Sequence, residues 1–170
     1  VEEAISKLDE ITSKYTRGKV LSEEDKNIVM AYLPVVGVDK AEVSQDGALV
    51  GEGAYAFSRS ELGCDVFVEG DAGCKGVGED RIEYWSKMAV KKTGGDNEIS
   101  RMRFKFSGMG FGMCPTQEMK VIYAREFERD FSHTDEAAAS FFDRYTLTQW
   151  GFYFTAQCEV LTDKGTVIVR

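Results

Sequence analysis

Residues 150–160 read Trp-Gly-Phe-Tyr-Phe-Thr-Ala-Gln-Cys-Glu-Val, and this order decides the fold class. The even-numbered positions carry mostly apolar side chains, while the odd-numbered positions carry glycine, threonine, glutamine and glutamate together with one tyrosine. Successive side chains of a β-strand point to opposite faces of a sheet, so the alternation predicts a strand with one face in a core. The predicted core face consists of Trp150, Phe152, Phe154, Ala156, Cys158 and Val160.

The same period of two recurs through most of the chain from about residue 41 onward. Turn sequences separate the runs: Asp46-Gly47, residues 94–97 and residues 163–165 each combine glycine with aspartate or asparagine, as tight hairpin turns require. We therefore expect an antiparallel meander that closes into a barrel or a strongly curved sheet. The other apolar stripes are Ile82, Tyr84, Met88 and Val90; Met102, Phe104 and Phe106; and Met119, Val121, Tyr123 and Phe127.

The apolar parity changes once inside a run. Phe104 and Phe106 occupy even positions, whereas Met109 and Phe111 occupy odd positions beyond Ser107 and Gly108. A one-residue slip moves side chains to the opposite face of a strand. Met109 and Phe111 would thus reach the core of Phe106 only through a β-bulge or a tight bend, and the sequence predicts one there.

Helical periodicity is limited to short parts of the chain. Residues 1–33 predict two helices, because apolar residues recur there at helical spacing and Gly18 separates the halves before a Ser22–Asp25 capping pattern. Residues 134–144 predict one short helix before the last long strand, since they contain three consecutive alanines. The expected fold class is α+β in a single domain, 1–170, with a helical segment at 1–33 and mainly antiparallel β-structure at 41–170.

The composition indicates one soluble, acidic domain. The 170 residues carry a formal net charge of −8, which opposes binding to nucleic-acid phosphates, so we expect no nucleic-acid partner. No stretch approaches the roughly 20 apolar residues of a membrane helix, so we expect no transmembrane segment. The sequence starts at Val1, which leaves two alternatives: a targeting segment removed on entry to an organelle or extracytosolic compartment, or a trimmed chain.

The basic residues Arg101, Arg103 and Lys105 share one parity opposite the stripe of Phe104. Strand alternation therefore places all three on one face, away from the core. We interpret this face as solvated; the alternative is a docking surface for an acidic partner.

Signatures of enzyme chemistry are missing. The chain has no Gly-x-Ser-x-Gly, His-Glu-x-x-His or Cys-x-x-Cys motif and no phosphate-binding loop that ends in Gly-Lys followed by Ser or Thr. His133 is the single histidine, and its surroundings favour the start of a helix over a general base. We therefore expect a protein that is not an enzyme, and an enzyme that uses Cys114 or His133 is the lesser alternative. The sequence identifies no cofactor.

Four cysteines do not have the spacing of a zinc site. Cys64 and Cys74 bracket a segment rich in glycine and are the disulfide candidates, provided that the compartment is oxidising. Cys158 lies on an apolar stripe and is predicted to be a buried thiol. The acidic segment 69–80 does not match the spacing of a calcium loop, so we expect no metal site.

Two hypotheses for function remain. The first is a non-catalytic binding or assembly module that docks into a larger protein complex, because two Trp, seven Tyr, eleven Phe and six Met provide more apolar bulk than charge-lined loops suggest. The second is a carrier of a small apolar or pigment-like ligand in a lipocalin-like barrel. The side chains expected at its mouth are Phe104, Phe106, Phe111, Trp150 and Phe154.

Overall fold

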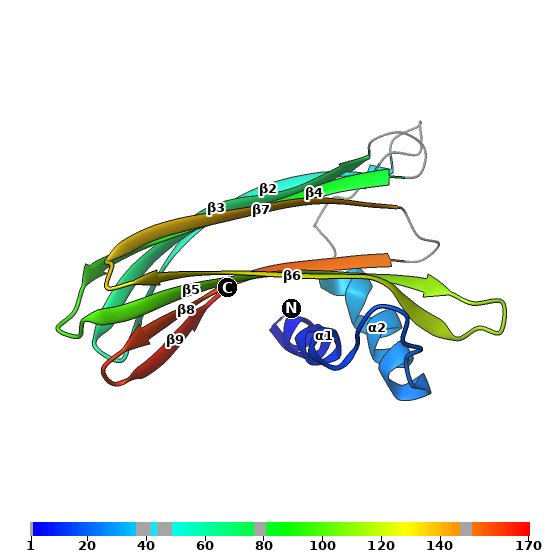
Figure 1. Cartoon of the computed structure of the whole chain (residues 1–170), viewed down its shortest axis with the longest axis horizontal. Helices are drawn as coiled ribbons and strands as arrows, with labels where there is room; N and C mark the ends of the chain where they lie inside the picture. Colours follow the sequence, from blue (N-terminus) through cyan, green and yellow to red (C-terminus); the bar gives the residue numbers. More distant parts are fainter. Residues whose placement is uncertain (1, 37–41, 44–48, 77–80, 147–150) are drawn as a thin grey trace.

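A computed structural model describes residues 2–36, 42–43, 49–76, 81–146 and 151–170 (Figure 1). Two helices come first and antiparallel strands follow, so the protein is α+β at this coarse level. The elements are α1 (Glu2–Lys14), α2 (Glu23–Val36), β1 (Glu42–Val43), β2 (Leu49–Glu61), β3 (Cys64–Gly76), β4 (Arg81–Gly94), β5 (Ile99–Met113), β6 (Met119–Ser132), β7 (Glu136–Thr146), β8 (Gly151–Thr162) and β9 (Gly165–Val169).

The strands form two separate sheets. The five-stranded sheet has the order β1-β2-β3-β4-β7, and the four-stranded sheet has the order β6-β5-β8-β9. Figure 1 shows the two sheets as stacked layers, with the helices below the four-stranded sheet. The expected closed barrel is wrong for the described residues, because β5 pairs with β6 and β8 and leaves β4 to pair with β7. The turn at 94–97 therefore joins two sheets, whereas residues 163–165 do form the expected hairpin.

The first core lies between the two sheets. Val68, Met88 and Val90 of the five-stranded sheet pack there with Phe104 and Phe106 of the four-stranded sheet, and all five are at most 1% exposed. Their burial follows the predicted alternation along β4 and β5. Removing apolar surface from water on this scale is the main stabilising contribution to such a fold.

A second core lies on the opposite face of the four-stranded sheet, where the helix pair covers it. Leu8 and Ile11 of α1 and Val29 of α2 contact the strands there, together with Met109 and Phe111. The parity change in β5 therefore marks the point where the strand passes from one core to the other. The bulge expected at Ser107-Gly108 is wrong, because β5 pairs with β8 without a shift from Phe106↔Ala156 to Phe111↔Gly151.

The β-bulge lies instead in β6. Gly110 pairs with Tyr123 and Phe111 pairs with Val121, so Ile122 is the extra residue. The bulge divides the stripe that the sequence presents as one: Met119 and Val121 face the helices, whereas Tyr123 packs between the sheets. An extra residue in one strand reverses the facing of everything beyond it.

The helix expected at 134–144 is wrong, because this segment is strand β7. Ala137, Ala139 and Phe141 are buried and pair with Val90, Met88 and Ser86 of β4. Tertiary pairing here overrides the helix propensity of alanine. His133 accordingly starts no helix; it lies in the turn before β7 with φ 49°, and its backbone N–H donates to the Ser100 carbonyl.

The two disulfide candidates lie at opposite ends of β3. Cys64 pairs with Glu61 and Cys74 pairs with Gly51, and both thiols are free. Ten residues of strand span roughly 33 Å, whereas a disulfide joins Cα atoms about 4.4–6.8 Å apart. A bond between Cys64 and Cys74 is therefore excluded in this fold. Burial raises the pKa of both thiols.

Candidate functional site

The aromatic residues predicted to line a common mouth are distributed over both cores. Phe104 and Phe106 are buried between the sheets, and Phe111 is buried under the helices on the other face of the same strand. Trp150 lies outside the described residues. Phe154 alone of this set lines one of the surface cavities described below.

The two candidate catalytic side chains lie at opposite ends of the β5–β6 pair. Cys114 follows Met113 at the end of β5. His133 follows Ser132 at the end of β6, and Ser132 pairs with Arg101 near the start of β5. Twelve residues of strand separate these ends by roughly 40 Å. Cys114 and His133 thus cannot form a nucleophile–base pair in this structure.

A polar network ties the sheets together within the first core. The hydroxyl of Tyr123 donates to the Asp143 carboxylate and also hydrogen-bonds the hydroxyl of Tyr84. Burial, followed by these two hydrogen bonds, raises the pKa of Tyr123. Tyr123 therefore stays protonated and neutral, which suits a structural tie between β4, β6 and β7 and opposes a role as a base.

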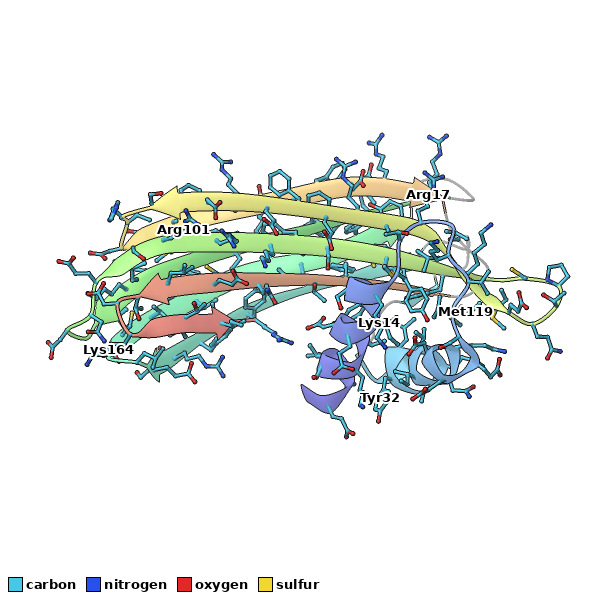
Figure 2. All side chains as sticks on the ribbon, turned by 60° about the horizontal axis from the view of Figure 1, so that its bottom comes forward. Lys14, Arg17, Tyr32, Arg101, Met119 and Lys164 are labelled. Carbon is cyan, nitrogen blue, oxygen red and sulfur yellow. The ribbon has the colours of Figure 1, made fainter. Side chains whose placement is uncertain are left out.

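The outer face of the four-stranded sheet carries charge beyond the helices. Figure 2 turns this face toward the reader, with α1 near the Met119 end of β6 and far from Lys164. Arg103 contacts Asp130 at 3.0 Å, and Lys105 contacts Glu159 at 3.0 Å. The predicted shared face of the basic residues is confirmed, and acidic neighbours compensate its charge, which favours the solvated interpretation over an acidic partner.

The outer face of the five-stranded sheet is built differently. Within the described residues, no helix or further strand covers it, and it holds a shallow depression of about 720 Å³. Small side chains predominate at its centre. We name this surface the alanine face; its two central rows across the strands are Ala54, Asp71, Lys87 and Ser140, and Ala56, Glu69, Ala89 and Ala138.

Aromatic and charged side chains border one end of the alanine face. Trp85 pairs with Phe142, which is 56% exposed, and the Arg144 guanidinium lies 5.8 Å from the Phe142 ring. Glu83 is buried beside them, accepts a hydrogen bond from Arg144 at 2.6 Å and forms an ion pair with Lys75 at 3.6 Å. These larger side chains, joined by ion pairs and ring contacts, border the centre of small side chains at this end.

Asp71 stands out within the alanine face. Its Oδ1 atom is buried and has no hydrogen-bond partner among the described residues. Lys87 is its direct cross-strand neighbour, yet no ion pair joins the two in the described part of the chain. A buried acceptor without a donor costs roughly 1–3 kcal/mol, so this oxygen atom lowers the stability of the fold.

Two further cavities lie where the sandwich opens between β2 and the β8–β9 pair. The inner one, about 330 Å³, is lined by Tyr55, Phe57, Phe154 and other residues of both sheets. The outer one, about 600 Å³, is lined by residues that include Arg59. Phe57 and Arg170 border both cavities, so the two adjoin, and we name them together the seam.

The alanine face and, apart from Phe154, the seam do not follow from the sequence pattern alone. A signal was present in Ala54-Tyr55-Ala56-Phe57-Ser58-Arg59, where small residues alternate with large ones. This pattern indicates a strand with its large side chains toward a core and its small ones outward. The register that aligns those small residues with Ala89 and Ala138 cannot be read from the local sequence.

No group of three or more histidine, cysteine, aspartate or glutamate side chains with metal-binding geometry occurs in the described ranges. None of the helices described is long and apolar enough to cross a membrane. Comparison of the chain with protein-family models, with curated proteins and with solved structures finds no match in any of the three.

Proposed function

We propose that the chain is a non-catalytic assembly module that associates with a second copy of itself through the alanine face. The observation that carries the proposal is the composition of this face: exposed small residues at the centre, one acidic strand and one basic neighbour, with Arg129 of β6 as a further basic residue in the lining. Glu69 and Asp71 lie on β3, whereas Lys87 lies on the adjacent β4. Such a face is complementary to itself.

The complementarity depends on the symmetry of the pair. In a two-fold dimer the same patch meets itself across an axis that lies in the interface. With this axis parallel to the strands and between β3 and β4, β3 faces β4 of the partner and β2 faces β7 of the partner. Asp71 then meets Lys87 of the partner, and Ala56 meets Ala138 of the partner. The twist of the sheets turns them by about 30°, so these contacts hold at the centre.

The alternative axis, perpendicular to the strands, gives a poorer match. It places the row of Asp71 against the row of Glu69 from the partner, so that two carboxylates meet on the same strand. Like charges placed face to face in an interface oppose association. The charge pattern therefore favours the axis parallel to the strands.

The size of the face is sufficient for a stable dimer. Four strands about 4.8 Å apart and 13 residues long, as β2 and β3 are, cover roughly 800 Å². Specific interfaces bury about 800 Å² on each partner. Small side chains at the centre allow two sheets to approach closely, and the Lys87 ammonium of the partner would lie against the Asp71 carboxylate.

The test is the molar mass in solution, measured by light scattering after size exclusion over a range of micromolar concentrations. We expect twice the chain mass for the wild type. Asp71→Lys presents only cations at the central pairs and Lys87→Asp presents only carboxylates, so each variant alone should be monomeric. Mixing the two variants should restore a dimer, because each cation then meets a carboxylate of the other chain.

The mixing experiment separates association from folding. Contacts within one chain are the same in the mixture as in each variant alone, so only an interface between chains can recover the mass. The matched control is Lys105→Asp, a charge reversal on the outer face of the four-stranded sheet, which should leave the dimer intact. A monomeric wild type, or a mixture that stays monomeric, would overturn the proposal.

A further inference from the structure

The sandwich has an open side between β2 and β8. β1 pairs with β2 only at Leu49 and Val50, and β9 pairs with β8 only over Cys158–Thr162. Along the rest of β2 and β8, these edges have no neighbouring strand within the described residues. The side chains between them are only partly buried at this opening. They are Tyr55, Phe57, Phe154 and Ala156.

The inner cavity of the seam combines aromatic walls with two hydroxyl groups. Its lining includes Ser86, which is 3% exposed, and Tyr55, whose hydroxyl donates to the Lys87 carbonyl at 3.3 Å. Burial, with a further contribution from the charge of Asp71, raises the pKa of Tyr55 to about 12. Apart from Arg170, which also lines the outer cavity, the side chains of the inner cavity are therefore uncharged at neutral pH. Mostly apolar walls with a few fixed polar groups are typical of small-molecule sites.

The outer cavity of the seam carries positive charge. Arg59 reaches across the opening, and its Nη1 donates to the Ile168 carbonyl at 2.7 Å. No carboxylate of the described residues lies within 4.0 Å of Arg59. Arg170 also lines this cavity, but its Nη1 contacts Asp9 Oδ2 at 2.6 Å. The mouth thus holds two guanidinium groups and one carboxylate, and Arg59 retains an uncompensated charge.

We propose that the seam binds a small amphipathic carboxylate, with its apolar body between Phe57 and Phe154 and its carboxylate on Arg59. A guanidinium presents paired N–H donors that match a carboxylate, and its hydrogen bonds to an anion are stronger than those between neutral groups. The inner cavity of about 330 Å³ lies at the lower end of the range for ligand pockets, roughly 300–1,000 Å³. The apolar body is therefore a short acyl chain or a single ring system.

This site shares only Tyr55 with the lining of the alanine face, because its other side chains do not belong to the outer face of the five-stranded sheet. Tyr55 points between the sheets, whereas its neighbours Ala54 and Ala56 point outward. Ligand binding and self-association can thus be tested independently, and either can fail alone.

The probes are octanoate and 1-octanol, which share a chain length but differ in charge. We expect calorimetric titration to give saturable octanoate binding at least roughly tenfold tighter than octanol binding, because a hydrogen bond to a charged partner contributes that much. Arg59→Gln should remove this preference and leave octanol binding unchanged, and Arg59→Lys should retain part of it. The matched control is Arg101→Gln, a loss of the same charge on the outer face of the four-stranded sheet.

Two further measurements locate the site. Ala72→Phe fills the inner cavity and should abolish binding of both probes, whereas Thr166→Phe, an exposed position of β9, should leave both unchanged. In the wild type, octanoate should shift the amide resonances of Tyr55, Phe57 and Phe154, a readout that needs no variant. Equal affinity for octanoate and octanol, no saturable binding at millimolar concentration, or shifts centred on the helices or the alanine face would each overturn the proposal.

Discussion

The outer faces of the two sheets are made of the same kind of strand but are protected differently. On the four-stranded sheet, the helix pair covers Met109 and Phe111 at one end, and ion pairs around Arg103 and Lys105 occupy the other. Among the described residues, the alanine face has neither a helix layer nor such a network of pairs at its centre. Large apolar residues are present where the chain covers them itself. Small residues are present where, in our proposal, a second copy covers them.

The largest expected effect concerns the end of the four-stranded sheet that the helices cover. Phe111 is fully buried between β5 and the helix pair. Phe111→Ala should lower the free energy of unfolding by about 3–5 kcal/mol, because the helices and strands can only partly close the cavity. Urea denaturation followed by circular dichroism measures this difference.

The matched control is Phe142→Ala on the rim of the alanine face, where the side chain is 56% exposed. Within the monomer this change should cost less than about 1 kcal/mol. Both variants are to be compared at the lowest practical concentration, so that association adds nothing to the apparent stability. Equal losses at Phe111 and Phe142 would mean that the two faces are not covered as described.

The sequence alone predicts the strands and the helix pair well, since each depends on a local period. It does not show which core a side chain faces. By alternation alone, Met109 and Phe111 would face away from the core, because the second core under the helices is not visible in the sequence. Tyr123 would share the face of Met119, because the bulge at Ile122 is not visible either. Which core a side chain faces depends on long-range packing, so local alternation cannot predict it.

The helix prediction for residues 134–144 was wrong for a related reason. Ala137 and Ala139 favour a helix in isolation, but a strand needs only small inward side chains where it crosses Met88 and Val90. The candidate sites were still harder to foresee. The centre of the alanine face gathers residues from Ala54 to Ser140, and the seam joins Arg59 to Arg170. Pairing over such distances in sequence follows from topology.

The next effect concerns the contact between α1 and β8. Tyr153 is 5% exposed, because α1 covers its face of β8. The Tyr153 hydroxyl donates to Asp9 Oδ1 at 2.9 Å. Tyr153→Phe should cost about 1–3 kcal/mol, because it removes a donor from a partly buried carboxylate.

A double-mutant cycle checks that assignment. Asp9→Asn and Tyr153→Phe should be non-additive in urea denaturation, since they share one hydrogen bond. The Arg170→Gln change provides a comparison, because Arg170 contacts the other oxygen of Asp9. Additive losses at Asp9 and Tyr153 would mean that α1 is not tied to β8 through this pair.

A smaller effect depends on pH and belongs to the junction of the two helices. The hydrogen bond from Tyr15 lowers the pKa of Asp25, although burial opposes it, and Lys14 lowers the pKa further. A carboxyl whose pKa is lower in the folded state stabilises the fold above its ordinary pKa of about 3.9 and loses this contribution as pH falls through the lowered value. Asp25→Asn should thus destabilise the protein at pH 7, and the difference from the wild type should shrink below about pH 4.

Asp9, also in the helix pair, should contribute a pH dependence of stability opposite in sign to that of Asp25. Burial raises the pKa of Asp9 more than its bonds to Tyr153 and Arg170 lower it. The contribution of Asp9 to stability should therefore weaken as pH rises from the ordinary pKa of an aspartate toward the raised pKa of Asp9. Thermal unfolding of the wild type, Asp25→Asn and Asp9→Asn from pH 2.5 to pH 7 measures both slopes. Parallel curves for the two variants would contradict the assignment.

The smallest effect tests the charged end of the four-stranded sheet. Glu159 lies between two cations, with Lys105 at 3.0 Å and Arg103 at 3.6 Å, and its side chain is 18% exposed. Glu159→Gln should cost only about 0.5–1 kcal/mol, because exposed ion pairs are weakened by solvent and by the entropy of long side chains. Glu128→Gln, the matched control with one longer contact at 3.9 Å, should cost less still. Neither change should alter the molar mass, since this face would remain in water in the proposed dimer. A loss of dimer in Glu159→Gln would show that the charged face, and not the alanine face, joins the two copies.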